Sequence, residues 1–96
     1  MQFLVICQDG KDAEAPARRM KVRQEHLANM ARLKKAGHYL IGGAILNEQG
    51  GMIGSAMIFD FPDSAALEAE LKADPYSTED VWRQIEIKPY RVAAVV

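Results

Sequence analysis

Three polar side chains that could do chemistry lie at helical spacing within one short segment. Arg19 and Arg23 are one helical turn apart, and His26 follows three residues later. On a helix these side chains share one side with Met30 and Leu33, which are apolar. An imidazole exchanges protons near neutral pH, and a guanidinium stabilises negative charge. If this face borders a cavity, the grouping is typical of proton transfer on a small molecule.

The same helical wheel predicts which residues of this segment enter the core. The apolar arc contains Met20, Leu27, Met30, Ala31 and Leu33, and the opposite side carries Arg18, Lys21, Glu25 and Arg32. We therefore expect Leu27 to be buried and Lys21 to be exposed. An alternative stays open for the polar residues of the arc: arginine stems cover apolar surface while their heads reach water, and His26 is a hydrogen-bonded core histidine.

The segment ADPY, residues 73–76, carries the second candidate group. An Asp-Pro pair commonly ends a helix, so Asp74 could be only a helix terminator. In the functional alternative, Asp74 lies beside His26, holds the imidazole in one tautomer and stabilises its protonated form. The two interpretations require different surroundings for the same carboxylate.

The other potentially reactive side chains give weaker signals. Ser55 follows a glycine at the start of a strand and could place a hydroxyl at a cavity mouth, but no Gly-x-Ser-x-Gly motif surrounds it, which disfavours a serine hydrolase. Cys7 is the only cysteine, so we expect no internal disulfide, no thiolate cluster and a small buried hydrophobe in a strand. His38 is expected to be a solvated loop residue, and two isolated histidines predict no metal site.

Length and charge limit the function classes. The 96 residues predict a single domain, and twelve basic against thirteen acidic side chains give a formal net charge of −1. No global field would attract nucleic acid or an anionic membrane. No apolar run approaches the roughly 20 residues of a membrane span, and no signal peptide is recognisable. We therefore expect a cytoplasmic protein with neither nucleic-acid nor membrane partners.

The order of predicted elements indicates the fold class. Strands are expected at residues 2–8, 39–46, 52–61 and from about 85 to 92; helices are expected from between Asp12 and Pro16 to Gly37, and from Asp63 or Ser64 to Asp74. A short turn or helical piece is expected around Val81 and Trp82, and Pro89 predicts an edge position or a bulge. The order β-α-β-β-α-β is that of an α+β, ferredoxin-like fold with both helices on one face of an antiparallel sheet. The uncovered face predicts a homodimer with two sheets facing each other.

Several motifs together resemble the YciI-like (YCII-related) family. In chain order they are Arg23-x-x-His26-Leu27, Gly42-Gly43, Gly54-Ser55, Ala73-Asp74-Pro75-Tyr76 and Ile85-Glu86-Ile87-Lys88-Pro89-Tyr90. The resemblance covers nearly the whole chain and implies a single YciI-like domain over residues 1–96 that forms a dimeric α+β barrel. It also implies that His26 and Asp74 form a pair in a pocket, with Arg23 and Ser55 beside it. Ala44 stands where the family usually has proline, and Glu79-Asp80 where it has a small Ala-Gly pair, which leaves the substrate open.

The leading functional hypothesis is a cofactor-independent lyase or isomerase of a small cyclic or aromatic substrate. His26 would be the general base oriented by Asp74, and Arg23, in preference to Arg19, would stabilise the developing oxyanion. Tyr76 and Arg19 are further expected substrate contacts. Relatives with this fold and pair resemble dehydrochlorinases of chlorinated hydroxyhydroquinones, an aromatic-degradation reaction. The alternatives are a non-catalytic binding or accessory module for a small anionic metabolite, and a structural dimer without a ligand.

Overall fold

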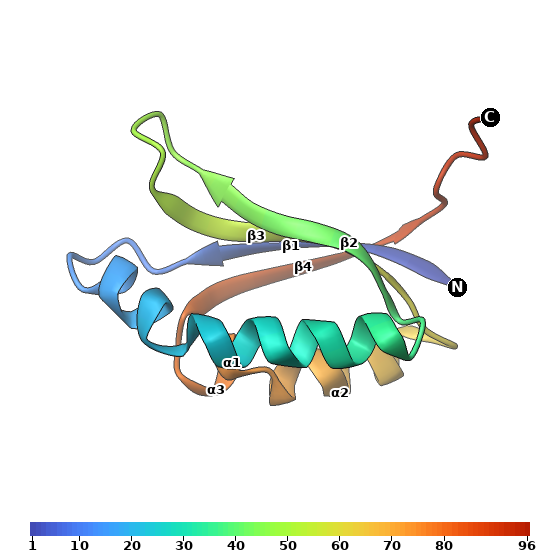
Figure 1. Cartoon of the computed structure of the whole chain (residues 1–96), viewed down its shortest axis with the longest axis horizontal. Coiled ribbons are helices and arrows are strands. Elements are labelled where there is room, and N and C mark those ends of the chain that lie inside the picture. The colour runs from blue at the N-terminus through green and yellow to red at the C-terminus, as the bar shows by residue number, and fades with distance from the viewer.

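The chain forms one four-stranded antiparallel sheet with three helices on one of its faces (Figure 1). This computed structural model describes residues 1–96. The elements are β1 (Gln2–Asp9), α1 (Ala15–Lys35), β2 (Tyr39–Leu46), β3 (Met52–Asp60), α2 (Ser64–Ala73), α3 (Pro75–Thr78) and β4 (Trp82–Tyr90). The strands lie in the order β2-β3-β1-β4. The predicted ferredoxin-like α+β fold is therefore confirmed, and Pro89 lies in an edge strand as expected.

Local signals set the ends of the helices. Gly37 follows α1 with a φ of +84°, a conformation that glycine adopts without the steric cost of a Cβ. Asp63 caps α2, because its Oδ1 accepts a hydrogen bond from the backbone N–H of Ala66 at 2.9 Å. No helix is both long enough and apolar enough to cross a membrane.

The short helix α3 differs from the prediction. A turn or helical piece was expected around Val81 and Trp82, but the helix spans Pro75–Thr78 and Trp82 begins β4. Asp74 ends α2 and also caps α3, its side chain accepting from the backbone N–H of Tyr76. Proline fits the first position of a helix, where its missing N–H costs nothing. The Asp-Pro pair therefore stops one helix and starts the next.

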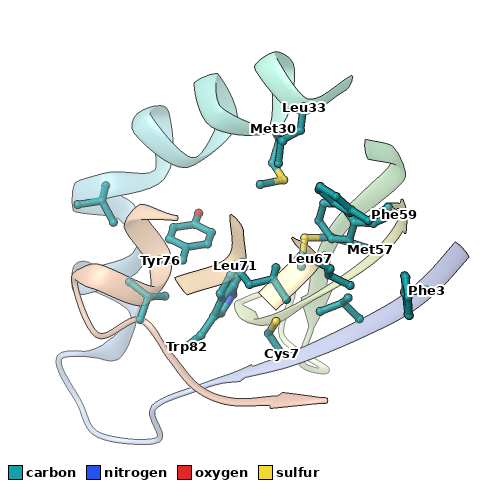
Figure 2. Close-up of a cluster of buried hydrophobic side chains, with 14 residues drawn as sticks. Phe3, Cys7, Met30, Leu33, Met57, Phe59, Leu67, Leu71, Tyr76 and Trp82 are labelled. Carbon is teal, nitrogen blue, oxygen red and sulfur yellow. The ribbon is translucent and has the colours of Figure 1, made fainter. Parts of the chain in front are cut away.

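Alternation along β1 decides which side chains meet the helices. Phe3, Val5 and Cys7 are almost completely buried, and their partners on β3 are Phe59, Met57 and Ser55. All of these side chains except that of Ser55 pack beneath the helices in a cluster of fourteen buried hydrophobic residues (Figure 2). Asp9 continues the same alternation and is also buried, so the buried row on β1 ends in a carboxylate.

The opposite face of the sheet also carries apolar side chains. Leu4 pairs with Ile58, Ile6 pairs with Ala56, and Ile41 on β2 pairs with Ile58. Residues paired directly across strands share a face, so all five point away from the helices. We call them the open-face patch. Ile41 is 64% exposed, so nothing within the chain covers this end of the patch.

The buried side of α1 differs from the predicted arc. Leu27, expected in the core, is 45% exposed, and Met20 is 57% exposed, whereas Val22 is buried. The buried residues of the helix are Ala15, Arg19, Val22, His26, Met30 and Leu33. Leu27 lies on the flank toward β2 and lines a cavity together with Gly42. Gly42 pairs with the buried Met57 and so lies on the helix-facing side of β2, where it has no side chain to cover the leucine. Lys21 is exposed as predicted.

Two leucines of α1 allow a matched test of this packing. Leu33 is 1% exposed and belongs to the core cluster, so Leu33→Ala should lower the free energy of unfolding by about 2–5 kcal/mol. Leu27→Ala on the same helix should cost about 1 kcal/mol or less, because it removes little packed surface. Urea unfolding followed by circular dichroism measures both values. Equal losses would contradict the observed orientation of α1.

Candidate active site

The structure brings His26 and Asp74 into direct contact. His26 lies in the middle of α1 and Asp74 at the junction of α2 and α3, and His26 Nδ1 is 2.8 Å from Asp74 Oδ2. His26 is 7% exposed and Asp74 is completely buried. An ionised carboxylate can only accept a hydrogen bond, so Nδ1 carries the proton and Nε2 of the neutral ring has a free lone pair. His26 is thus arranged as a base.

The carboxylate of Asp74 is held by three donors. Besides His26, the backbone N–H of Tyr76 donates to Oδ2 at 2.9 Å and the Asn29 side-chain amide donates to Oδ1 at 2.8 Å. A buried carboxylate without such partners would be strongly destabilising. The cap of α3 and the partner of His26 are therefore the same group, and the two interpretations of Asp74 do not exclude each other.

Two aromatic rings fix the plane of the His26 imidazole. The Tyr76 ring stacks on it, with centroids 3.9 Å apart and planes 14° from parallel. The Trp82 ring meets it edge-on at 5.5 Å and 82°. Tyr76 and Trp82 lie side by side below α1 (Figure 2). A ring packed on its face and its edge has little freedom to turn, so Nε2 keeps one direction.

Arg19 and Ser55 are tied to other protein groups. Arg19 Nη1 lies 2.9 Å from both carboxylate oxygens of Asp9, and Nη2 donates to Ser55 Oγ at 2.9 Å. Trp82 Nε1 donates to the same hydroxyl at 3.1 Å. The guanidinium carbon of Arg19 also lies 4.6 Å from the Tyr76 ring centroid. This cluster therefore contacts both aromatic rings that pack against His26.

Arg23 has a different environment from Arg19. It is half-buried, makes no ion pair within the chain, and lines the same cavity as His26. Its positive charge is therefore not neutralised by a neighbouring carboxylate. Of the two arginines, Arg23 is the one whose charge remains available to an anionic group in the cavity.

The cavity lies between α1 and β2 and has a volume of about 80 Å³. Its lining comes from four elements and comprises Arg19, Arg23, His26, Leu27, Met30, Tyr39, Gly42, Gly43, Ala44, Ser55, Met57 and Tyr76. A Cβ on Gly42 would approach Tyr39 Oη to 2.6 Å and Met57 Cγ to 2.7 Å, so this position needs glycine. Small-molecule sites commonly measure about 300–1,000 Å³. A cavity of this size can enclose the reacting end of a small planar compound.

The Tyr76 hydroxyl adds a proton donor to this cavity. Burial raises the pKa of Tyr76, an effect that the nearby Arg19 and Arg23 guanidinium groups partly oppose. The phenol therefore stays protonated at neutral pH. It can donate a hydrogen bond to an oxygen of a bound molecule.

His38 is packed more closely than a solvated loop residue, so that expectation was wrong. Its ring stacks on Phe61 with centroids 4.3 Å apart, and Nδ1 lies 2.8 Å from the Asp60 carbonyl oxygen. The half-buried side chain thus packs against the residues at the end of β3.

No group of three or more His, Cys, Asp or Glu side chains is arranged to hold a metal ion.

Sequence reasoning missed three residues of the site. The strand predicted at residues 2–8 excludes Asp9, although this residue continues the alternation that buries Phe3, Val5 and Cys7 and could have been paired with a buried arginine on that ground. Asn29 lies three residues after His26 and so on the same side of α1, which was a usable signal. Trp82 gave none, because its position depends on where α3 ends.

The family model of the YCII-related domain matches residues 1–91, and the chain belongs to this family. Protein YciI of Escherichia coli O6:H1 is 31% identical over 97 residues, which cover 95% of this chain and 97% of that protein. An uncharacterized protein of Haemophilus influenzae is 28% identical over the same shares of both chains. The family predicted from the motifs is thereby confirmed.

Solved structures show the same fold. The 5-chloro-2-hydroxyhydroquinone dehydrochlorinase of Burkholderia phenoliruptrix, in complex with 2,5-dihydroxybenzoquinone, superposes with a TM-score of 0.83 at 19% identity and covers 97% of this chain and 96% of its own. A cofactor-independent oxygenase of Streptomyces nogalater has a TM-score of 0.55 at 14% identity, over 97% of this chain and 94% of its own. Identities this low show a shared fold alone.

Cys7, the only cysteine, lies next to this site because it pairs with Ser55 across β1 and β3. Burial raises its pKa from the ordinary 9.0 to about 12, and the Asp9 and Asp74 carboxylates add to the shift. A thiol with a raised pKa stays neutral and is a weak nucleophile. Cys7 is completely buried and belongs to the hydrophobic core, as predicted.

Alkylation tests this state of Cys7. At pH 9 the thiolate fraction should fall from about one half in the unfolded chain to roughly one thousandth in the folded protein. Iodoacetamide followed by mass spectrometry should therefore show almost no modification of the native protein and rapid modification in guanidinium chloride. Raising the pH toward 12 increases the thiolate fraction and should speed the native reaction. Fast labelling of the native protein at pH 8 would contradict the raised pKa.

Proposed function

We propose that the protein is a cofactor-independent enzyme that moves protons on a small cyclic or aromatic substrate. One observation carries the proposal: His26 lines the cavity, and Asp74 holds its Nδ1 while Nε2 makes no hydrogen bond within the chain. A neutral imidazole oriented in this way can take a proton from a substrate hydroxyl and return it elsewhere. Asp74 stabilises the imidazolium formed in between.

Dehydrochlorination of a chlorinated hydroxyhydroquinone is the specific reaction that we propose. His26 would remove the proton of one ring hydroxyl and deliver a proton to the carbon that carries chlorine. As a second hydroxyl loses its proton, its electrons move into the ring and the carbon–chlorine bond breaks, releasing chloride. The products are a hydroxyquinone and HCl. No external oxidant or reductant is needed, since the leaving chloride takes the electron pair.

Two cavity groups fit the charges of this reaction. Arg23, which has no carboxylate partner, would stabilise the phenolate oxygen or the departing chloride. The protonated Tyr76 hydroxyl would donate to a ring oxygen. The dehydrochlorinase with the same fold supports the choice of substrate class, and the small cavity favours a single ring over a larger molecule.

Substitution of the His–Asp pair tests the mechanism. His26→Gln should reduce kcat for 5-chloro-2-hydroxyhydroquinone by at least about 1,000-fold, because glutamine cannot take up the proton. Asp74→Asn should reduce kcat by a factor of about 100 or more and change KM less, since it removes the charge that stabilises the imidazolium. Chloride release and quinone absorbance report both rates.

His38→Gln is the matched control for these variants. It removes the only other histidine, at a site packed against Phe61, and should leave kcat unchanged. Full activity of His26→Gln would rule out the proposed base. Saturable binding of the compound to the wild-type protein without chloride release would instead favour the binding-module alternative.

We also propose that a second copy of the chain covers the open-face patch. The patch is apolar and continuous across β2, β3 and β1, and the helices all lie on the other face. A 96-residue chain buries only about two thirds of its unfolded surface, so burial between two sheets adds stability that one copy lacks. The polar residues of β4 would lie at the rim of such an interface.

Light scattering tests the dimer. The wild-type protein should have twice the 10.7 kDa chain mass at micromolar concentration. Ile41→Glu should shift the mass toward that of one chain while keeping the helical circular dichroism, because Ile41 is exposed within its own chain and charge is unfavourable in an apolar interface. Gln84→Glu on β4 introduces the same charge outside the patch and should remain dimeric. A wild-type monomer would exclude this assembly.

A further inference from the structure

A line of polar side chains connects the His–Asp pair to the protein surface. Asn29 donates to Asp74 Oδ1 at 2.8 Å, and its own Oδ1 accepts from Arg32 Nη2 at 2.8 Å and Arg32 Nε at 3.1 Å. Arg32 Nη2 also lies 2.7 Å from Glu70 Oε2 on α2. The line therefore runs from an ion pair between α1 and α2 to the buried carboxylate.

Chemistry fixes the direction of every bond in this line. A guanidinium can only donate and an ionised carboxylate can only accept. An asparagine amide between them must turn its oxygen to Arg32 and its NH₂ group to Asp74. Glu70 keeps the guanidinium in place from the other side. The amide of Asn29 thus has one orientation that satisfies both neighbours, and that orientation supplies a donor to Asp74.

The side-chain NH₂ group of Asn29 donates to Asp74 Oδ1, the oxygen that does not contact His26. Oδ2 already accepts from His26 and from the backbone of Tyr76, while the protein's only bond to Oδ1 comes from Asn29. Without it, a completely buried oxygen would lack a partner, and the carboxyl group would gain by turning toward another donor. Any such rotation moves Oδ2 away from Nδ1.

We propose that Asn29 is a positioning residue that locks the Asp74 carboxylate against His26 Nδ1, with Arg32 and Glu70 holding the amide in the orientation required. His26, Asn29 and Arg32 follow one another at intervals of three residues on α1. The same flank of one helix therefore carries the base, the residue that aligns its partner and the residue that aligns the amide. The effect of this lock on turnover rests on the proposed function, whereas its effect on the His26 hydrogen bond does not.

The Asn29→Asp variant distinguishes two roles of Asn29: aligning the Asp74 carboxylate, and linking α1 to α2 through Arg32 and Glu70. Aspartate keeps an oxygen for Arg32 but has no hydrogen to donate to Asp74. If Asn29 only linked Arg32 to the fold, this variant would behave as the wild type. If Asn29 aligns Asp74, the variant loses that alignment and places a second carboxylate beside the first. Asn29→Ala removes both contacts and serves as the second variant should the aspartate impair folding.

Proton NMR of the His26 Nδ1–H measures the alignment without any substrate. A hydrogen-bonded, buried Nδ1–H should give a downfield resonance that exchanges slowly with water, assigned by its loss in His26→Gln and its retention in His38→Gln. We expect Asn29→Asp and Asn29→Ala to exchange this proton at least about tenfold faster, and Arg32→Ala to show a smaller change in the same direction. Lys35→Ala, in the last turn of α1, is the control and should show none.

Kinetics on 5-chloro-2-hydroxyhydroquinone give the second readout. Misalignment of the pair should lower kcat by about 10- to 100-fold in the Asn29 variants with KM nearly unchanged. If the wild-type protein is inactive but the Asn29 variants lose the slow Nδ1–H exchange, the proposed reaction fails and the positioning role stands. If folded Asn29→Asp and Asn29→Ala both keep the wild-type Nδ1–H resonance, the positioning role is overturned.

Discussion

The buried negative charge of Asp74 is the constraint on which the site depends. A carboxylate with no accessible surface is tolerated only when donors surround it, and here the donors come from three places: a backbone amide of α3, an amide on α1 and the imidazole. Satisfying the charge therefore brings α1 to the junction of α2 and α3. The requirement that builds the site also joins the helical layer together.

A second buried charge, on Arg19, lies beside the aromatic rings that hold the imidazole. Its ion pair with Asp9 joins α1 to the end of β1, and its bond to Ser55 joins the same helix to β3. Tyr76 lies between the two clusters, since it stacks on His26 and also lies near the Arg19 guanidinium. The cluster around Asp74 and the cluster around Arg19 share aromatic neighbours. A substitution in one cluster should therefore alter the geometry of the other.

Most of the fold could be predicted from the sequence, because periodicity, turns and caps are local signals. The strands, both long helices and the end of α2 at the Asp-Pro pair followed from neighbouring residues, whereas the start of α3 at the same pair did not. Leu27 shows the limit: its burial depends on what lies opposite it in space, and Gly42 could be placed opposite α1 only once β2 was positioned. Among the site residues, His26 and Asp74 were recognised as a possible pair. Asn29 could have been added from its spacing to His26, whereas the position of Trp82 depends on tertiary contacts that no local pattern encodes.

Two methionines among the walls of the cavity, Met30 and Met57, have a consequence for how the protein can diversify. Unbranched thioether side chains adopt several conformations at little cost and adapt to differently shaped surfaces. His26 and Asp74 are held rigidly by hydrogen bonds and ring stacking, while part of the cavity wall consists of side chains that change shape easily. The shape of the cavity can thus change through its methionine wall without moving the His–Asp pair.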